Sequence, residues 1–261
     1  MPRFAANLSL MFNEVPFMER FARAAGQGFR GVEYLFPYAF EARDIAAELE
    51  RHRLQQVLFN LPPGDWEAGE RGIAALPGRE AEFRASVDTA LHYAEILQCR
   101  QLHVMAGVVP APDRWETMHH CWLENLAWAA PRFERAGITL LIEAINNRDM
   151  PGYLITHQQQ ARDAVKTLGA PNVRMQMDLY HTQIMEGDLW RTWQRHREQT
   201  GHLQAAGVPG RHEPDSGEVD YAWLFEQLDR AGYAGWIGCE YKPRGDTAAG
   251  LGWFERWRSL Q

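Results

Sequence analysis

The sequence is poor in cysteine and lysine, and it contains no long apolar run. The 3 cysteines, Cys99, Cys121 and Cys239, are odd in number and show no CxxC spacing, as is typical of a protein in a reducing compartment. No apolar stretch approaches the roughly 20 residues of a membrane-spanning helix, and the first residues do not resemble a signal peptide. We therefore expect a soluble, cytoplasmic protein that does not bind a membrane.

Positive charge is also scarce. The formal net charge of −7 at pH 7 argues against a nucleic-acid partner, because phosphates require a basic face. An anionic small substrate is still compatible with this charge, since local charge decides such binding. Lys166 and Lys242 are the only lysines among 27 basic residues. No Gly-x-Gly-x-x-Gly turn follows the first predicted strand, which weakens the case for a dinucleotide-binding fold.

Strand-like and helix-like segments alternate along the chain. Short β-branched or aliphatic runs predict eight strands, at residues 4–8, 31–35, 54–60, 101–105, 138–143, 173–178, 201–205 and 235–240. Amphipathic patterns predict helices at residues 17–25, 42–52, 79–98, 115–136, 157–168, 189–199, 221–231 and 251–258. Eight strand–helix units in 261 residues predict an α/β fold, a (β/α)8 TIM barrel, with residues 1–261 forming a single domain.

Four strands in the second half end at or near a side chain with a metal-competent oxygen. These residues are Glu143, Asp178, Gln204 and Glu240. The C-terminal ends of barrel strands converge on one site, and burying a carboxylate there costs several kcal/mol unless it is paired or holds a cation. Three carboxylates and an amide are hard ligands that suit Mg²⁺ or Mn²⁺, although Zn²⁺ or Co²⁺ could also bind. The alternative is that each acid caps a helix or pairs with an arginine.

The alternation of side chains along a strand predicts which residues face the barrel axis. Residues two apart share a face, so Gln176 and Asp178 are expected to point inward. Trp236, Gly238 and Glu240 are expected to do the same on the last strand. The apolar residues between them are expected to face the surrounding helices: Val173, Met175, Met177, Ile237 and Cys239.

Several basic side chains follow these strands. His181 comes three residues after Asp178 and would reach a substrate oxygen if a helix starts there, whereas an ordinary helix N-terminal histidine is the alternative. Arg211, in the loop after the seventh strand, offers a fork for a carboxylate. Lys242 shares a face with Glu240, where a cation could bind a substrate carboxylate or stabilise an enediolate oxygen.

Two further residues are weaker candidates for substrate binding. Arg71 lies in the sequence GERG at residues 69–72, after the third strand, which could form a lid or a carboxylate clamp. His103 lies within the fourth strand. It is either a residue of the barrel interior or part of a pocket wall, and the sequence leaves both alternatives open.

With these residues in the positions described, the chain resembles the hydroxypyruvate isomerase family, within the wider xylose-isomerase-like barrels. The similarity runs over essentially the whole length. Its most specific stretches are RGIAALPGRE at 71–80, INNRDMPG at 145–152, QIMEGDL at 183–189, PGRHEP at 209–214 and GWIGCEYKP at 235–243.

The resemblance implies a metal held by the four strand-end residues, with Glu143 and Glu240 as the catalytic acid/base pair. It also implies that His181 and Arg211 face the substrate. Many members of the wider superfamily carry histidine where Gln204 stands, and an amide oxygen is a harder ligand than imidazole. The metal's identity is therefore left open.

The expected reaction interconverts hydroxypyruvate and 2-hydroxy-3-oxopropanoate (tartronate semialdehyde). A base removes the C3 proton beside the carbonyl, an enediolate forms with the help of the divalent ion, and a proton returns to C2. Lys242, Arg211 and Arg71 would hold the carboxylate of this small oxo-acid.

Other functions are compatible with the same scaffold. The nearest is an isomerase for a longer oxo-acid such as 2-oxo-tetronate (2-dehydrotetronate), followed by a ketose 3-epimerase and an inosose-type dehydratase. An endonuclease for damaged DNA needs further histidine ligands and a basic face, which this acidic chain does not prominently offer. A non-catalytic sugar-binding barrel would leave two glutamates at one metal unexplained. A homo-oligomer is compatible with the sequence.

Overall fold

The computed structural model describes residues 2–258 of the chain. Its strands form a closed parallel barrel in sequence order, and β8 pairs with β1 to complete it. The strands are β1 (Arg3–Asn7), β2 (Gly31–Glu33), β3 (Gln55–Asn60), β4 (Gln101–His103), β5 (Thr139–Glu143), β6 (Val173–Asp178), β7 (Thr200–Gln204) and β8 (Trp236–Cys239). The predicted (β/α)8 barrel is confirmed.

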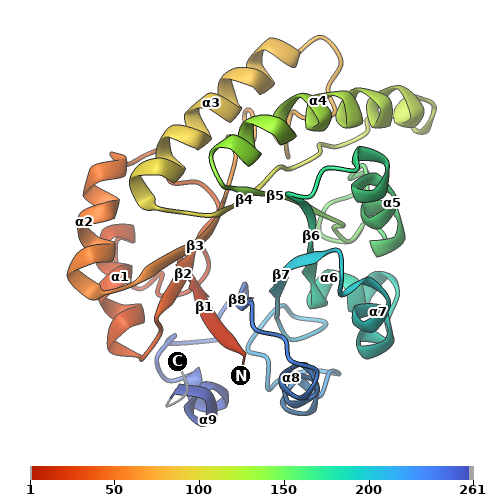
Figure 1. Cartoon of the computed structure of the whole chain (residues 1–261). Helices are drawn as coiled ribbons and strands as arrows, with labels where there is room; N and C mark the ends of the chain where they lie inside the picture. Colours follow the sequence, from red (N-terminus) through yellow and green to blue (C-terminus); the bar gives the residue numbers. More distant parts are fainter. Residues whose placement is uncertain (1, 259–261) are drawn as a thin grey trace.

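The helices surround this barrel as an outer layer (Figure 1). They are α1 (Phe17–Gly26), α2 (Ala42–His52), α3 (Glu80–Leu97), α4 (Trp115–Arg135), α5 (Gln158–Leu168), α6 (Leu179–Met185), α7 (Leu189–His196), α8 (Tyr221–Arg230) and α9 (Glu255–Arg258). Two 3-10 turns, Pro112–Arg114 and Leu251–Phe254, precede α4 and α9. Within residues 2–258, no helix has both the length and the apolar character needed to cross a membrane.

One helix has no counterpart among the predicted segments. α6 begins directly after β6, where the Oδ1 atom of Asp178 accepts a hydrogen bond from the backbone N–H of Tyr180 at 2.8 Å and so caps the helix. With 7 residues, α6 is too short to show a helical hydrophobic period of its own. The predicted helix at 251–258 is also divided, because its first turn is a 3-10 turn and only Glu255–Arg258 is α-helical.

The side chains of the strands divide between two apolar regions, as the alternation predicts. Met175 and Met177 of β6, and Ile237 and Cys239 of β8, are buried in the main core against the helices. Trp236 belongs to a small separate cluster. The other members of that cluster also come from strands: Ala5, Val57, Leu58 and Leu141.

A buried polar group is also held inside the barrel and centres on Glu33, the last residue of β2. The Oε1 atom of Glu33 accepts hydrogen bonds from Asn7 Nδ2 at 3.1 Å and from Gln204 Nε2 at 2.7 Å. Its Oε2 atom lies 2.8 Å from His202 Nε2. Strands β1, β2 and β7 are therefore joined through one fully buried carboxylate.

The close approach of Glu33 to β8 makes Gly238 a sensitive position. A Cβ atom at residue 238 would overlap the Glu33 carboxylate. We expect Gly238→Ala to lower the free energy of unfolding by about 1–3 kcal/mol, the usual cost of overpacking a buried site. Gly252→Ala is the matched control, because a Cβ there meets no atom within 4 Å. Urea unfolding measures both, and equal midpoints for the two variants would contradict the prediction.

Candidate active site

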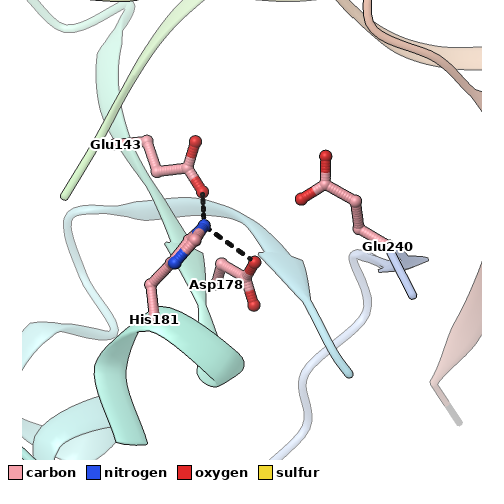
Figure 2. A group of neighbouring side chains, drawn as sticks. All are labelled: Glu143, Asp178, His181 and Glu240. Carbon is pink, nitrogen blue, oxygen red and sulfur yellow. Dashed lines mark ion pairs between the residues drawn. The ribbon is translucent and has the colours of Figure 1, made fainter. Parts of the chain in front are cut away.

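Three buried carboxylates meet at the C-terminal end of the barrel. Glu143 ends β5, Asp178 ends β6, and Glu240 directly follows β8. Together with His181 they each offer a ligand atom within 4.8 Å of the others, and Figure 2 shows the four side chains. Each of them is between 0% and 6% exposed. The structure thus brings three of the four predicted metal ligands together.

Burial changes the proton affinity of these carboxyl groups. It raises the pKa of Asp178 to about 6 and that of Glu240 to about 8, and in both cases Arg211 opposes the rise. Burial, followed by the charges of Glu240 and Asp178, raises the pKa of Glu143 well above its ordinary value. Glu143 and Glu240 therefore hold their protons more readily than ordinary carboxyl groups unless positive charge is brought to them.

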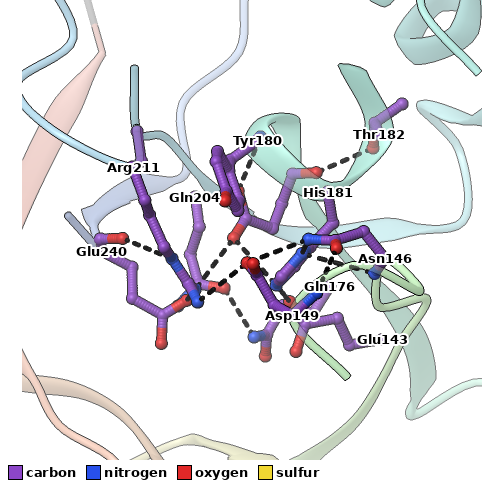
Figure 3. A network of polar contacts seen from close by, with 12 residues as sticks. Glu143, Asn146, Asp149, Gln176, Tyr180, His181, Thr182, Gln204, Arg211 and Glu240 are labelled. Carbon is purple, nitrogen blue, oxygen red and sulfur yellow. Dashed lines mark hydrogen bonds and ion pairs between the residues drawn. The ribbon is translucent and has the colours of Figure 1, made fainter. Parts of the chain in front are cut away.

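Arg211 supplies part of that positive charge. Its Nη2 atom lies 2.7 Å from Glu240 Oε2 and 3.6 Å from Asp178 Oδ2. Figure 3 shows Arg211 beside Glu240. Nevertheless, Oε1 of Glu143 and Oδ2 of Asp178 are buried and accept no hydrogen bond from the described residues. One arginine does not balance three carboxylates, whereas a divalent cation would. Buried carboxylate oxygens with free lone pairs fit such an ion, so this group of residues could hold a metal.

Gln204, the remaining predicted ligand, lies on the strand between Asp178 and Glu240. It is the register partner of Asp178 on one side and of Gly238 on the other. Because its Nε2 atom donates to Glu33 at 2.7 Å, the orientation of the amide is fixed. Its Oε1 atom accepts from Gln176 Nε2 at 2.6 Å and retains a second lone pair. Gln204 can therefore offer an oxygen, but not a nitrogen, to a hard cation.

Two histidines flank the carboxylates. His181, in the first turn of α6, places its Nε2 atom 3.5 Å from Asp178 Oδ2 and 3.8 Å from Glu143 Oε1. His103 ends β4, and its Nε2 atom lies 3.7 Å from Glu143 Oε2. Burial, with a further contribution from His202, lowers the pKa of His103 to about 3. Burial, followed by the charges of Arg211 and His103, lowers the pKa of His181 well below its ordinary value. Both rings are thus neutral at physiological pH.

A cavity of about 510 Å³ opens at this group of residues, a size typical of small-molecule sites. His103 lines it, which decides between the two alternatives left open by the sequence. Arg71 and Lys242 line it as well, as do Glu143, His181, Arg211 and Glu240. All of the predicted substrate-binding residues therefore reach one cavity.

The two basic residues at the rim are held differently. The guanidinium of Arg71 lies 3.9 Å from the ring centroid of Trp66, and its Nη1 atom donates to the carbonyl oxygens of Trp66 and Glu70 at 3.0 and 2.7 Å. Lys242 is exposed, and its side chain forms no ion pair with any residue between 2 and 258. Arg71 is thus fixed in place, whereas Lys242 is free to turn toward a ligand.

Residues that the sequence interpretation did not select also belong to this site. Glu33 lay within the predicted strand 31–35 and was not selected. A charged residue in a buried strand needs a partner, and this was the signal that could have identified Glu33. Asn146, in the loop after β5, is fully buried and contacts His181. Asp149 lies in the same loop, 3.9 Å from Arg211. No pattern in the sequence distinguishes these two loop residues from their neighbours.

Comparison with known proteins places the chain in a family. The family model for the xylose isomerase-like TIM barrel matches residues 21–257. The 2-oxo-tetronate isomerase of Cupriavidus necator is 53% identical over 98% of both chains. The hydroxypyruvate isomerase of Escherichia coli is 45% identical and covers 99% of this chain and 100% of its own.

A solved structure gives the same result for the backbone. The crystal structure of a protein from Brucella melitensis, described as an AP endonuclease of family 2, is 56% identical and superimposes with a TM-score of 0.97. The match covers 99% of this chain and 100% of that one. The chain therefore belongs to the xylose isomerase-like TIM barrel family, in the group that contains the named hydroxypyruvate and 2-oxo-tetronate isomerases.

Proposed function

We propose that this protein is an isomerase that interconverts a 3-hydroxy-2-oxo acid and the corresponding 2-hydroxy-3-oxo acid. The observation that carries the proposal is the pair Glu143 and Glu240, two proton-retaining carboxyl groups that line one cavity beside basic residues. Relatives named hydroxypyruvate isomerase and 2-oxo-tetronate isomerase support the same reaction.

Two substrates share this chemistry and differ in one group. In HO–CHR–CO–COO⁻, R is hydrogen for hydroxypyruvate and CH₂OH for 2-oxo-tetronate. Removal of the C3 proton gives an enediolate. A proton added at C2, with transfer of the O3 proton to O2, gives O=CR–CHOH–COO⁻. Atoms and charge balance without an external oxidant or reductant, so a base and an acid are the groups that the protein must supply.

The two glutamates are placed to move these protons. Figure 2 shows Glu143 and Glu240 on opposite sides of the group, and both side chains line the same cavity. One carboxylate would remove the C3 proton, and the other, or the same group, would deliver a proton to C2. Because burial raises both pKa values, each group can hold a proton near neutral pH and release it when charge develops nearby.

A divalent cation, Mg²⁺ or Mn²⁺ as the hard oxygen ligands favour, would be held by Glu143, Asp178, Gln204 and Glu240. When bound, such an ion polarises a carbonyl and stabilises the negative charge that develops on the substrate oxygens. Zn²⁺ or Co²⁺ could occupy the same ligands. The neutral rings of His181 and His103 would line the wall next to the reacting carbons.

The substrate carboxylate needs a cation that is not already engaged. Arg211 is paired with Glu240 at 2.7 Å, so its charge is largely compensated. Arg71 is stacked on Trp66 and uses one terminal nitrogen for backbone carbonyls, which leaves the rest of the guanidinium available. We assign carboxylate binding chiefly to Arg71 and Lys242, with Arg211 facing the reacting end.

We expect Arg71→Ala to raise KM about 10- to 100-fold with a smaller effect on kcat, because a charge-assisted hydrogen bond contributes about 1.5–3 kcal/mol. Arg132→Ala is the matched control. Its guanidinium lies 3.5 Å from the ring centroid of Trp128, and it donates to the carbonyl of that tryptophan at 2.9 Å, but on the outer helix α4. Steady-state kinetics with both variants measures the effect, and an unchanged KM in Arg71→Ala would remove this residue from substrate binding.

The four-carbon acid is the second candidate substrate. The 53% identical relative carries the name 2-oxo-tetronate isomerase, and a cavity of about 510 Å³ has room for the additional CH₂OH group. Values of kcat/KM for the two acids, measured on the same preparation, decide between them. Ketose 3-epimerase and inosose dehydratase activities should be assayed on the same preparation. We expect them to be weaker, because a neutral sugar has no carboxylate for Arg71 and Lys242 to bind.

The experiment that tests the reaction class is turnover in D₂O. We expect deuterium to appear on the carbon that receives the proton, at least in part, because the carboxyl groups exchange with solvent. Complete transfer of the label from C3-deuterated substrate, with no solvent exchange under any condition, would indicate a hydride shift and would contradict the enediolate route. Cleavage of abasic DNA without any turnover of the oxo-acids would instead support an endonuclease, although the formal net charge of −7 disfavours such a partner.

A further inference from the structure

The side-chain amide of Asn146 has only one orientation that satisfies its neighbours. Its Oδ1 atom accepts hydrogen bonds from the backbone N–H groups of Arg148 and Asp149, both at 2.9 Å. An N–H group cannot accept, so the atom facing these two donors is the oxygen. The Nδ2 atom is therefore fixed on the other side, where it donates to Asp149 Oδ2 at 3.1 Å and lies 2.6 Å from His181 Nδ1.

Two hydrogen-bond donors converge on that ring nitrogen. Besides the amide Nδ2, the backbone N–H of Asn146 points at His181 Nδ1 at 3.4 Å. Neither group has a lone pair available, so Nδ1 of His181 has to be the acceptor. A neutral imidazole with a lone pair on Nδ1 carries its hydrogen on Nε2. Figure 3 shows Asn146 and His181 side by side above the carboxylates.

We propose that Asn146 is a positioning residue that holds His181 as the Nε2–H tautomer, so that His181 donates a hydrogen bond to the substrate and does not bind the metal. The tautomer follows from the contacts alone, whereas the role toward substrate rests on the proposed function. Its Nε2 atom lies 3.5 Å from Asp178 Oδ2 and 3.8 Å from Glu143 Oε1, so the hydrogen faces the buried carboxylates in the cavity that His181 lines.

This tautomer selects among the residues that could hold the metal. The four side chains whose ligand atoms lie within 4.8 Å of one another include His181. A nitrogen that carries a hydrogen has no lone pair for a cation, so His181 leaves the ligand set. Gln204, whose oxygen is kept available by the bond from its Nε2 atom to Glu33, then provides the fourth ligand. A neutral N–H donor facing the developing oxyanion is the type of group that stabilises an enediolate.

The test is the position of the ring hydrogen of His181, observed by long-range ¹H–¹⁵N correlation spectra of protein labelled with ¹⁵N-histidine. The signals of His181 are identified by their absence in His181→Gln. We expect a hydrogen on Nε2 and a bare Nδ1, both in metal-free protein and at saturating Mg²⁺ or Zn²⁺. A hydrogen on Nδ1 in the wild type, or loss of the Nε2 hydrogen when metal binds, would overturn the proposal.

A variant identifies the cause of the tautomer. Asn146→Asp retains an oxygen for the N–H groups of Arg148 and Asp149 but replaces the Nδ2 donor with an acceptor, so Nδ1 of His181 should gain a hydrogen. Asn147→Asp adds the same charge at the exposed neighbouring position and should leave the wild-type pattern unchanged. An unchanged pattern in folded Asn146→Asp would show that Asn146 does not set the tautomer. If this variant does not fold, the wild-type spectra with and without metal still show which ring nitrogen of His181 carries the hydrogen.

The spectra are recorded without substrate, so they separate this proposal from the proposed function. A protein with Nε2–H His181 that turns over neither oxo-acid would contradict the function but not the tautomer. An active isomerase whose His181 carries its hydrogen on Nδ1 would contradict the tautomer but not the function.

Discussion

Replacing either glutamate, as Glu143→Gln or Glu240→Gln, is expected to lower kcat by at least about two orders of magnitude, the usual scale for general acid–base catalysis. Glutamine keeps an oxygen that can bind a cation but cannot accept or deliver a proton at neutral pH. Both side chains line the cavity and lie within one group of ligand atoms, so each is positioned to exchange a proton with the same substrate.

The same substitutions are not expected to unfold the barrel. Because burial raises the pKa of Glu143 and Glu240 above their ordinary values, their charged forms destabilise the metal-free fold near neutral pH, and a neutral amide removes that penalty. Glu226→Gln is the control, since Glu226 is paired with Arg230 and Arg256 on the outer surface. Kinetics, circular dichroism and metal content are measured together. A near-wild-type rate in either folded variant would remove that residue from the mechanism.

Exhaustive chelation is expected to abolish turnover, and Mg²⁺ or Mn²⁺ is expected to restore it. Three carboxylates lie in one buried group, and Oε1 of Glu143 and Oδ2 of Asp178 accept no hydrogen bond from the described residues. Among the described residues, Arg211 is the only permanently charged cation that contacts these carboxylates. A divalent cation there supplies both charge balance and activation of the substrate carbonyl. Full activity in protein shown by elemental analysis to contain no metal would contradict this prediction.

The thermal stability of the protein provides a second test of metal binding at this site. The pKa of Asp178 is raised to about 6 and that of Glu240 to about 8, so the metal-free fold binds more protons than the unfolded chain over this range. These extra protons stabilise the metal-free fold fully below the ordinary pKa values of 3.8 for Asp178 and 4.5 for Glu240. This contribution to the free energy of unfolding is lost as the pH rises to about 8. We therefore expect Mg²⁺ to raise Tm more at pH 8 than at pH 6. An equal shift at both values would show that the ion binds elsewhere.

The fold could be predicted from the sequence because its determinants are local and periodic. Runs such as Val173–Asp178 alternate inward and outward residues, and amphipathic helices lie between the strands, so the barrel follows from strand and helix periods alone. The carboxylates Glu143, Asp178 and Glu240 could be placed for the same reason. A residue at the C-terminal end of a barrel strand lies at the same face of the barrel as the ends of the other strands, irrespective of the conformation of the loops between them.

Only the tertiary structure decided how these groups are held. Glu33 meets His202 and Gln204 across sequence separations of 169 and 171 residues, and Asn146 meets His181 across 35. Contacts of this kind depend on barrel closure and on loop backbone conformation, neither of which leaves a periodic pattern in the sequence. The sequence by itself therefore determined which strand-end carboxylates gather at the barrel mouth. Long-range packing determined which loop residues join them and which of their atoms are hydrogen-bonded.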